Sequence, residues 1–248
     1  SIMEARARNQ EEEKCTIVDV DNTPIDADDF RCEYTVDSVP RIPKSMKPGR
    51  FSWSATIVRE RRFGRAVRYW FYMGNDVRAC PSFVAGQHGA MIGCNMIISA
   101  NKSDLSLPSS LRSEGYAGKV RRVACEKEPF YYGVFNKDRK QMMSVSRSHS
   151  GMKISLDVPR NNRKIHLATR VSCYDPLSSC VVEYGGRVKK ASTKNFQIVH
   201  EGLAVDKTGR KHPNVLLQMG RATSHTFAVE FSYPFFPFEA FALCLVNF

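Results

Sequence analysis

The C-terminal segment PFEAFALCLVNF, residues 237–248, constrains the fold of this chain more than any other stretch. Its last ten residues carry only two polar side chains, Glu239 and Asn247. Pro237 suits the first turn of a helix, where an N–H has no partner to lose, and Glu239 places negative charge at the positive end of the helix dipole. Twelve helical residues span about 18 Å, well short of the roughly 30 Å hydrocarbon core of a bilayer. A helix that is apolar on every face and too short to cross a membrane is expected inside a protein.

From Phe51 onward the chain consists of short strand-like runs separated by turn residues, a pattern typical of an antiparallel sandwich or barrel. The clearest run is TFAVEF, where Phe227, Val229 and Phe231 alternate with other residues at the period of a half-buried strand. No long helix is expected before residue 237. One apolar helix among many strands predicts a mainly β (α+β) fold, with a closed sheet wrapped around the helix. The expected strands lie near residues 53–60, 67–73, 79–85, 94–100, 119–125, 130–136, 152–158, 164–171, 179–184, 195–199, 214–220 and 225–232.

Charge divides the chain into two parts. Residues 1–37 carry eleven acidic and four basic side chains, a net charge of −7, so with +12 overall the remainder carries +19. We expect an acidic leader over 1–37, partly disordered and with one short strand near 16–20, followed by a barrel domain over 38–248. A body this basic indicates an anionic partner, such as nucleic acid, phosphoinositide headgroups or an acidic protein; the alternative is a solvated basic surface.

The chain shows no signature of secretion, of a metal site or of catalysis. Eight cysteines are scattered without a CxxC pair, and the N-terminal segment SIMEARARNQEEEKC has no apolar signal region, so we expect reduced thiols in the cytosol or nucleus. HExxH is missing too, and we expect neither metal nor cofactor. The segment Ser146–Ser150 contains serine and histidine but is interpreted as a polar turn. We therefore expect a protein that is not an enzyme.

Motifs over the last 65 residues or so occur in the order and spacing of a known family. These are GRV (186–188), ASxKNFQIxH (191–200), QxGR (218–221), FxYP (231–234) and AFA (240–242). Weaker matches lie upstream: FVAG (83–86), NMIIS with SDLS (95–99 and 103–106), YxGKxR (116–121) and KISLxVP (153–159). With these motifs, residues 51–248 resemble the C-terminal domain of the tubby family.

The resemblance implies a twelve-stranded antiparallel β-barrel threaded by a hydrophobic C-terminal helix. It further implies a non-catalytic adaptor that binds phosphatidylinositol 4,5-bisphosphate at the cytoplasmic face of a membrane. Family members are linked to ciliary receptor trafficking and to transcriptional control. The expected partners are thus anionic phosphoinositide lipids of the inner leaflet and trafficking proteins. The expected location is cytoplasmic and peripheral, at the inner face of a membrane, with the cilium (or flagellum) and the nucleus as further alternatives. We expect no transmembrane segment, and a monomer.

The same resemblance places a headgroup site at Lys119 and Arg121, which share one face if residues 116–121 form a strand. Arg59 and Arg61, from a basic cluster near the first hairpin, and His88 complete the expected set. However, the family has a dense Lys/Arg run after the Ala-Gly that matches residues 85–86. Here the stretch Gln87–Cys94 contains neither Lys nor Arg, and His88 carries charge only when protonated.

Three hypotheses therefore stay open for the barrel. The lipid site persists with a rearranged set of arginines, or the barrel binds anionic membranes diffusely, or it has become a protein-interaction scaffold that has lost specific lipid binding. A nucleic-acid-binding transcription regulator is a fourth hypothesis, which rests on charge alone.

Overall fold

The computed structural model describes residues 51–248 except 52, 61–66, 88–94, 109–110, 124–126, 159–162, 173–186, 204 and 207–214. The expected acidic leader and its short strand fall outside the described residues. So does the strand expected at 179–184.

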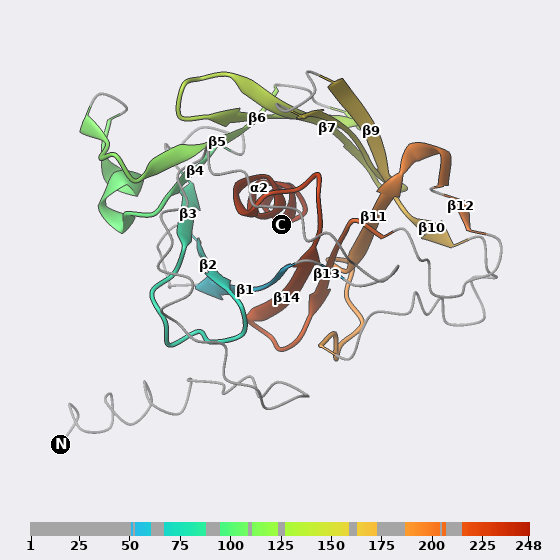
Figure 1. Ribbon diagram of the computed structural model, residues 1–248, viewed down its shortest axis with the longest axis horizontal. Coiled ribbons are helices and arrows are strands. Elements are labelled where there is room, and N and C mark those ends of the chain that lie inside the picture. The colour runs from blue at the N-terminus through green and yellow to red at the C-terminus, as the bar shows by residue number, and fades with distance from the viewer. Residues whose placement is uncertain are drawn as a thin grey trace.

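Twelve antiparallel strands close into a barrel, as the resemblance implies (Figure 1). Around the barrel the order is β1-β14-β13-β11-β9-β8-β7-β6-β5-β4-β3-β2, and a separate pair, β10 and β12, is parallel. The bounds are β1 Trp53–Glu60, β2 Arg68–Met73, β3 Phe83–Gln87, β4 Asn95–Ser99, β5 Tyr116–Arg122, β6 Phe130–Asn136, β7 Gln141–Ser148, β8 Gly151–Val158, β9 Arg163–Thr169, β10 Val171–Ser172, β11 Phe196–His200, β12 Val205–Asp206, β13 Leu217–Arg221 and β14 Thr226–Phe231. Two short 3-10 helices, η2 (Lys102–Ser106) and η4 (Glu201–Leu203), lie in the connections.

The helix α2 (Pro237–Val246) runs through the centre of the barrel, and all ten of its residues are buried (Figure 1). Pro237 occupies the first turn, as expected. The ring of Phe241 stacks on that of Phe71 in the barrel wall at 4.8 Å, and the ring of Phe248 stacks on Tyr69 at 4.6 Å. The apolar tail is therefore the core of the fold. Over the described part of the chain, no helix is long and apolar enough to cross a membrane.

Strand β7 was not expected, because residues 146–150 were interpreted as a turn. Ser146 and Arg147 in fact pair with Lys153 and Met152 of β8, and only the end of this segment forms the turn. Met143 and Val145 point into the core, whereas Ser144 and Ser146, which alternate with them, lie on the outer face. Outward serines give a strand the composition of a loop, so this part of the prediction was wrong.

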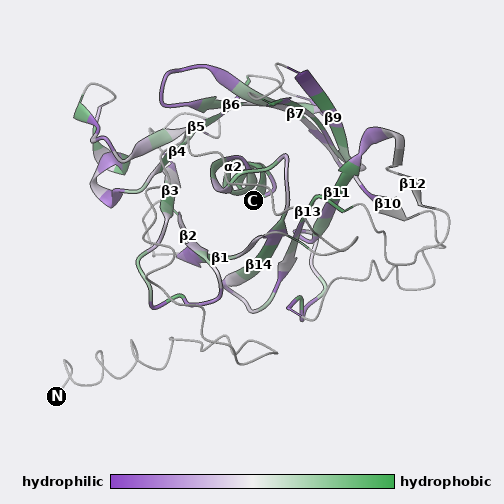
Figure 2. Ribbon diagram, viewed as in Figure 1, coloured by the Kyte–Doolittle hydropathy of each residue, from purple (hydrophilic) through white to green (hydrophobic). Residues whose placement is uncertain are grey.

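The two ends of the barrel carry different residues, and α2 ends at one of them. Strand pairing brings Glu60, Asn95 and Arg121 to one end, together with Arg147, and the carbonyl groups that end α2 lie there as well. We call this end the C-terminal rim. The opposite end carries the β6–β7 hairpin and the start of β9, where Figure 2 shows hydrophilic residues gathered.

Candidate functional site

A bulge in β5 aims two of the predicted site residues outward. Ile98 pairs with Gly118 and Ser99 with Tyr116, so Ala117 is an extra residue in β5. Bulges of this kind re-aim the side chains that follow them. Gly118 has a φ of 158°, and a Cβ there would lie 2.2 Å from the carbonyl oxygen of Phe135. A side chain at this position of β5 would collide with the backbone of β6, so glycine is required there.

Lys119 and Arg121 lie on the outer face of β5, because Val120 between them points into the core. Lys119 is half-buried, and its Nζ lies 5.8 Å from the centroid of the Phe135 ring; Arg121 is exposed. Asn95 of β4 is the cross-strand neighbour of Arg121. We call Asn95, Lys119 and Arg121 the outer basic patch. Within the described residues, neither cation of this patch forms an ion pair with a carboxylate.

A buried carboxylate stabilises the loop that joins β4 to β5, at the end of the barrel opposite the C-terminal rim. Asp104 of η2 accepts hydrogen bonds from the Ser99 hydroxyl at 2.6 Å, from the Ser113 N–H at 2.9 Å and from the Ser113 hydroxyl at 2.8 Å. Burial by itself would raise the pKa of Asp104, but these hydrogen bonds and the charge of Arg112 outweigh it and lower the pKa below its usual value. We infer that Asp104 fixes the β4–β5 connection rather than a ligand.

Of the other predicted site residues, the structure describes Arg59, and it does not join the outer basic patch. Arg59 lies on β1, four strands away from β5 around the barrel. Its Nη2 donates to the carbonyl oxygen of Ser224 at 3.2 Å, and its guanidinium lies 5.6 Å from the centroid of the Phe227 ring. Arg61 and His88 fall in gaps of the described chain. The structure thus brings together Lys119 and Arg121 from the predicted set.

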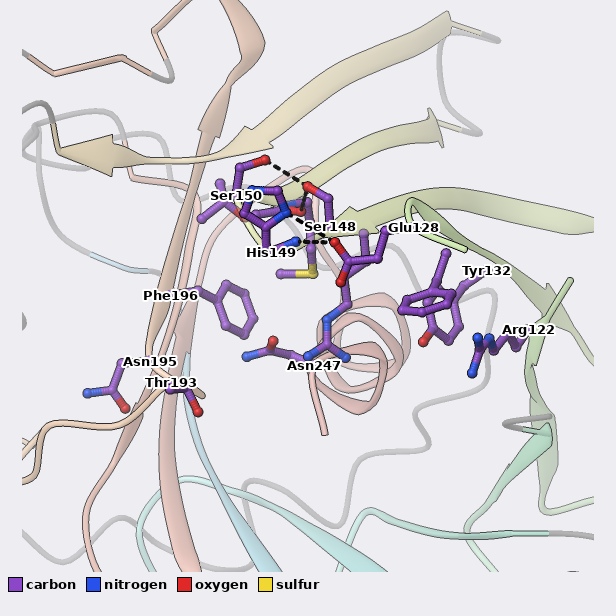
Figure 3. Close-up of a pocket in the computed structure, with 15 residues that line it drawn as sticks. Arg122, Glu128, Tyr132, Ser148, His149, Ser150, Thr193, Asn195, Phe196 and Asn247 are labelled. Atoms are coloured by element: carbon purple, nitrogen blue, oxygen red, sulfur yellow. Dashed lines mark hydrogen bonds and ion pairs between the residues drawn. The ribbon is translucent and has the colours of Figure 1, made fainter. Parts of the chain in front are cut away.

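A cavity of about 560 Å³ opens at the C-terminal rim, between the inner face of β5–β8 and the end of α2 (Figure 3). The guanidinium of Arg122, which points to the opposite face of β5 from Arg121, lies 4.0 Å from the centroid of the Phe130 ring in its wall. Nη1 of Arg147 donates to the carbonyl oxygen of Val246 at 2.6 Å. One wall of the cavity is therefore built from arginine side chains that pack on aromatic and helix-end groups.

Lys194 also forms hydrogen bonds at the C-terminal end of α2. Its Nζ donates to the main-chain oxygens of Asn247 at 2.5 Å and Phe248 at 3.1 Å, and Asn247 returns a bond from Nδ2 to the Lys194 carbonyl at 2.9 Å. Burial lowers the pKa of Lys194, and the charges of Arg147 and Arg59 lower it further. Cations that contact the last carbonyl groups of a helix donate hydrogen bonds to acceptors that have no partner within the helix. They also interact favourably with the negative end of the helix dipole. This role was not predicted for Arg147 or Lys194, since only barrel closure brings them to α2.

The serines and the histidine of the cavity wall are not arranged for nucleophilic catalysis. The Ser148 hydroxyl lies 2.7 Å from that of Ser150, while Nδ1 of His149 lies 3.1 Å from Oε2 of Glu128 (Figure 3). The histidine is thus engaged by a carboxylate at the surface and not by a serine. In the part of the chain that the structure describes, no group of three His, Cys, Asp or Glu residues could hold a metal ion.

Comparison with known proteins agrees with this architecture. The Tub family model matches residues 131–248. The chain is 39% identical over 74 residues to Tubby-related protein 2 of Mus musculus, which covers 30% of this chain and 12% of the mouse protein. It is 30% identical over 118 residues to Protein king tubby 1 of Aedes aegypti, covering 47% of this chain and 27% of the mosquito protein. It is 36% identical over 76 residues to Tubby-like F-box protein 2 of Arabidopsis thaliana, covering 30% of this chain and 19% of the plant protein. The matched segments span from 12% to 27% of the length of these curated relatives.

Proposed function

Since this chain carries a tubby-like C-terminal domain, we propose that it is a non-catalytic adaptor that binds phosphoinositide headgroups, of the phosphatidylinositol 4,5-bisphosphate type, at the outer basic patch. The observation that carries the proposal is the pair Lys119 and Arg121, side by side on one face of β5 without a carboxylate partner in the described residues. These two residues precede the segment that the family model matches, so their role is argued from geometry and charge.

The two cations and the amide suit a phosphorylated headgroup. A guanidinium presents a planar fork of donors to one phosphate, and an ammonium presents a compact point charge to another. Asn95, the cross-strand neighbour of Arg121, adds an amide donor. A hydrogen bond to a charged group contributes roughly 1.5–3 kcal/mol. Because the stretch Gln87–Cys94 contains no Lys or Arg, we expect a weaker headgroup site than one supported by a basic run.

Binding of this kind places the protein at the cytoplasmic face of a membrane as a peripheral component. We propose a role in membrane or ciliary protein trafficking, in which the barrel supplies the lipid contact. The competing hypothesis is a protein-interaction scaffold, which the missing basic run favours. Binding to lipid vesicles separates the two.

The test is co-sedimentation with vesicles at physiological salt. Phosphatidylcholine vesicles that contain phosphatidylinositol 4,5-bisphosphate are compared with phosphatidylserine vesicles of equal surface charge. We expect preferential binding to the former, and its loss in Lys119→Ala/Arg121→Ala. The control Arg163→Ala/Lys164→Ala removes the same charge from two exposed residues at the opposite end of the barrel. Equal binding to both vesicle types would contradict the specific-lipid proposal and favour diffuse attraction.

A further inference from the structure

Three large hydrophobic side chains are exposed in the described part of the chain, and two of them are neighbours. Leu111 is 64% exposed, Val123 54% and Tyr131 48%. The N–H of Val123 donates to the carbonyl oxygen of Tyr131 at 2.8 Å, so the β5–β6 ladder continues one step past the end of β5. Single exposed hydrophobic residues are common on protein surfaces, whereas Val123 and Tyr131 together form a small contiguous apolar patch.

Both side chains lie on the same outer face as the outer basic patch. Along β5 and just beyond it, Lys119, Arg121 and Val123 alternate with Val120, which is in the core, and Arg122, which lines the cavity. On β6, the neighbours of Tyr131 line the cavity, so Tyr131 points outward. Successive outward residues on a strand are about 7 Å apart. The cations are therefore followed, toward the C-terminal rim, by an apolar and an aromatic side chain.

We propose that Val123 and Tyr131 form an apolar wedge that enters the boundary between headgroups and acyl chains while Lys119 and Arg121 hold an anionic headgroup. The wedge rests on the proposed function and adds an orientation to it. It turns the C-terminal rim toward the bilayer, and it turns η2 and Leu111, at the other end of β5, away. Basic and apolar groups side by side are what an interfacial membrane contact requires.

The chemistry of the pair favours lipid over a protein partner. A tyrosine has an apolar ring and a polar hydroxyl, which suits it to the depth where acyl chains meet headgroups. Valine is apolar to its tip. Two half-exposed side chains cover far less than the roughly 1,000 Å² that a specific protein interface needs. At a membrane a small apolar area is sufficient, because neighbouring cations supply the rest of the attraction.

Vesicle binding by the double variant Val123→Ser/Tyr131→Ser tests the wedge. The matched control is Leu111→Ser, which removes a more exposed hydrophobic side chain at the opposite end of the barrel. Phosphatidylcholine vesicles with phosphatidylinositol 4,5-bisphosphate are the probe. We expect about tenfold weaker binding of the double variant, a change of about 1.4 kcal/mol, and wild-type binding by the control. Because the lost contact is apolar, the ratio should persist when salt is raised.

Two further measurements separate failure of the wedge from failure of the headgroup site. Soluble inositol 1,4,5-trisphosphate, titrated calorimetrically, reports the headgroup site alone, and the wedge predicts equal affinity for wild type and double variant. In addition, Tyr131→Trp should show blue-shifted emission and quenching by brominated lipids on vesicles, whereas Leu111→Trp should not.

Three other results would overturn the wedge, and they differ in what they imply for the headgroup site. Wild-type vesicle affinity in the double variant, with trisphosphate binding intact, would overturn the wedge and leave the headgroup site standing. Loss of trisphosphate binding in the double variant would also overturn it, because the change would then act through the headgroup site. A wild-type protein that binds neither trisphosphate nor vesicles would overturn the proposed function and the wedge together.

Discussion

Glu239 is an ionisable side chain placed where ionisation is unfavourable. It lies in the first turn of α2 inside the barrel, and burial raises its pKa to about 7, although hydrogen bonds from the N–H groups of Glu239 and Phe236 oppose the shift. Its Oε2 is buried without a hydrogen-bond partner in the described structure. A carboxyl group with a raised pKa keeps its proton in the folded state after the unfolded chain has released it.

This predicts a stability that falls as pH rises. Between about pH 4.5, the usual value, and about pH 7, the unfolded chain binds fewer protons at this site than the folded chain does. The free energy of unfolding should therefore decrease across that window by about 3 kcal/mol, at 1.36 kcal/mol per pKa unit. Glu239→Gln should flatten the slope and be more stable than wild type at pH 8.

Urea denaturation of both proteins at several pH values checks this prediction. Glu114→Gln, a change at an exposed carboxylate near the β4–β5 connection, serves as the control and should keep the wild-type slope. A Glu239→Gln protein with the wild-type slope would show that the helix-start carboxyl group is ionised in the folded state at neutral pH.

Arg147 contributes to stability through the end of α2. Its bond to the carbonyl oxygen of Val246 is charge-assisted and half-buried. We expect Arg147→Met, which keeps the apolar stem, to lower the free energy of unfolding by about 1.5–3 kcal/mol. Thermal melting is the measurement, with Arg163→Met at the opposite end as the control. An unchanged melting temperature would mean that water satisfies the helix end equally well.

At the scale of elements, α2 is the part on which the barrel depends. Its side chains form one core cluster with the inward side chains of the barrel wall, and Phe241 is fully buried between Phe71 and Phe83. Removing residues 237–248 would expose the inner face of the wall, so the truncated chain should not fold. The milder Phe241→Ala should lower the free energy of unfolding by about 3–5 kcal/mol. A truncated chain that melts cooperatively would refute this description of the core.

The helix and most strands could be predicted from the sequence because their patterns are local. A continuous apolar run after Pro237 and the alternation in TFAVEF each report burial directly. Strand β7 escaped prediction because its outward serines resemble a turn. Lys119 and Arg121 could be assigned to one face from the YxGKxR spacing, even though the bulge at Ala117 was not foreseen.

At the scale of the whole molecule, barrel closure determines which side chains meet, and no sequence pattern contains that information. Closure carries Arg147 and Lys194 to α2, and it separates Arg59 from Lys119 by four strands. It also places Val123 beside Tyr131. Exposure of those two residues could not be predicted, because a short apolar run looks the same whether it faces core or solvent.

The central claim is that the outer face of β4 and β5 holds a phosphoinositide headgroup. Calorimetric titration of inositol 1,4,5-trisphosphate into wild type, Lys119→Ala/Arg121→Ala and Arg163→Ala/Lys164→Ala tests it most directly, because the soluble headgroup carries no membrane with it. We predict binding by wild type and by the distant control, and at least about tenfold weaker binding by the patch variant. Equal affinity in all three proteins, or no binding by wild type, would contradict the claim.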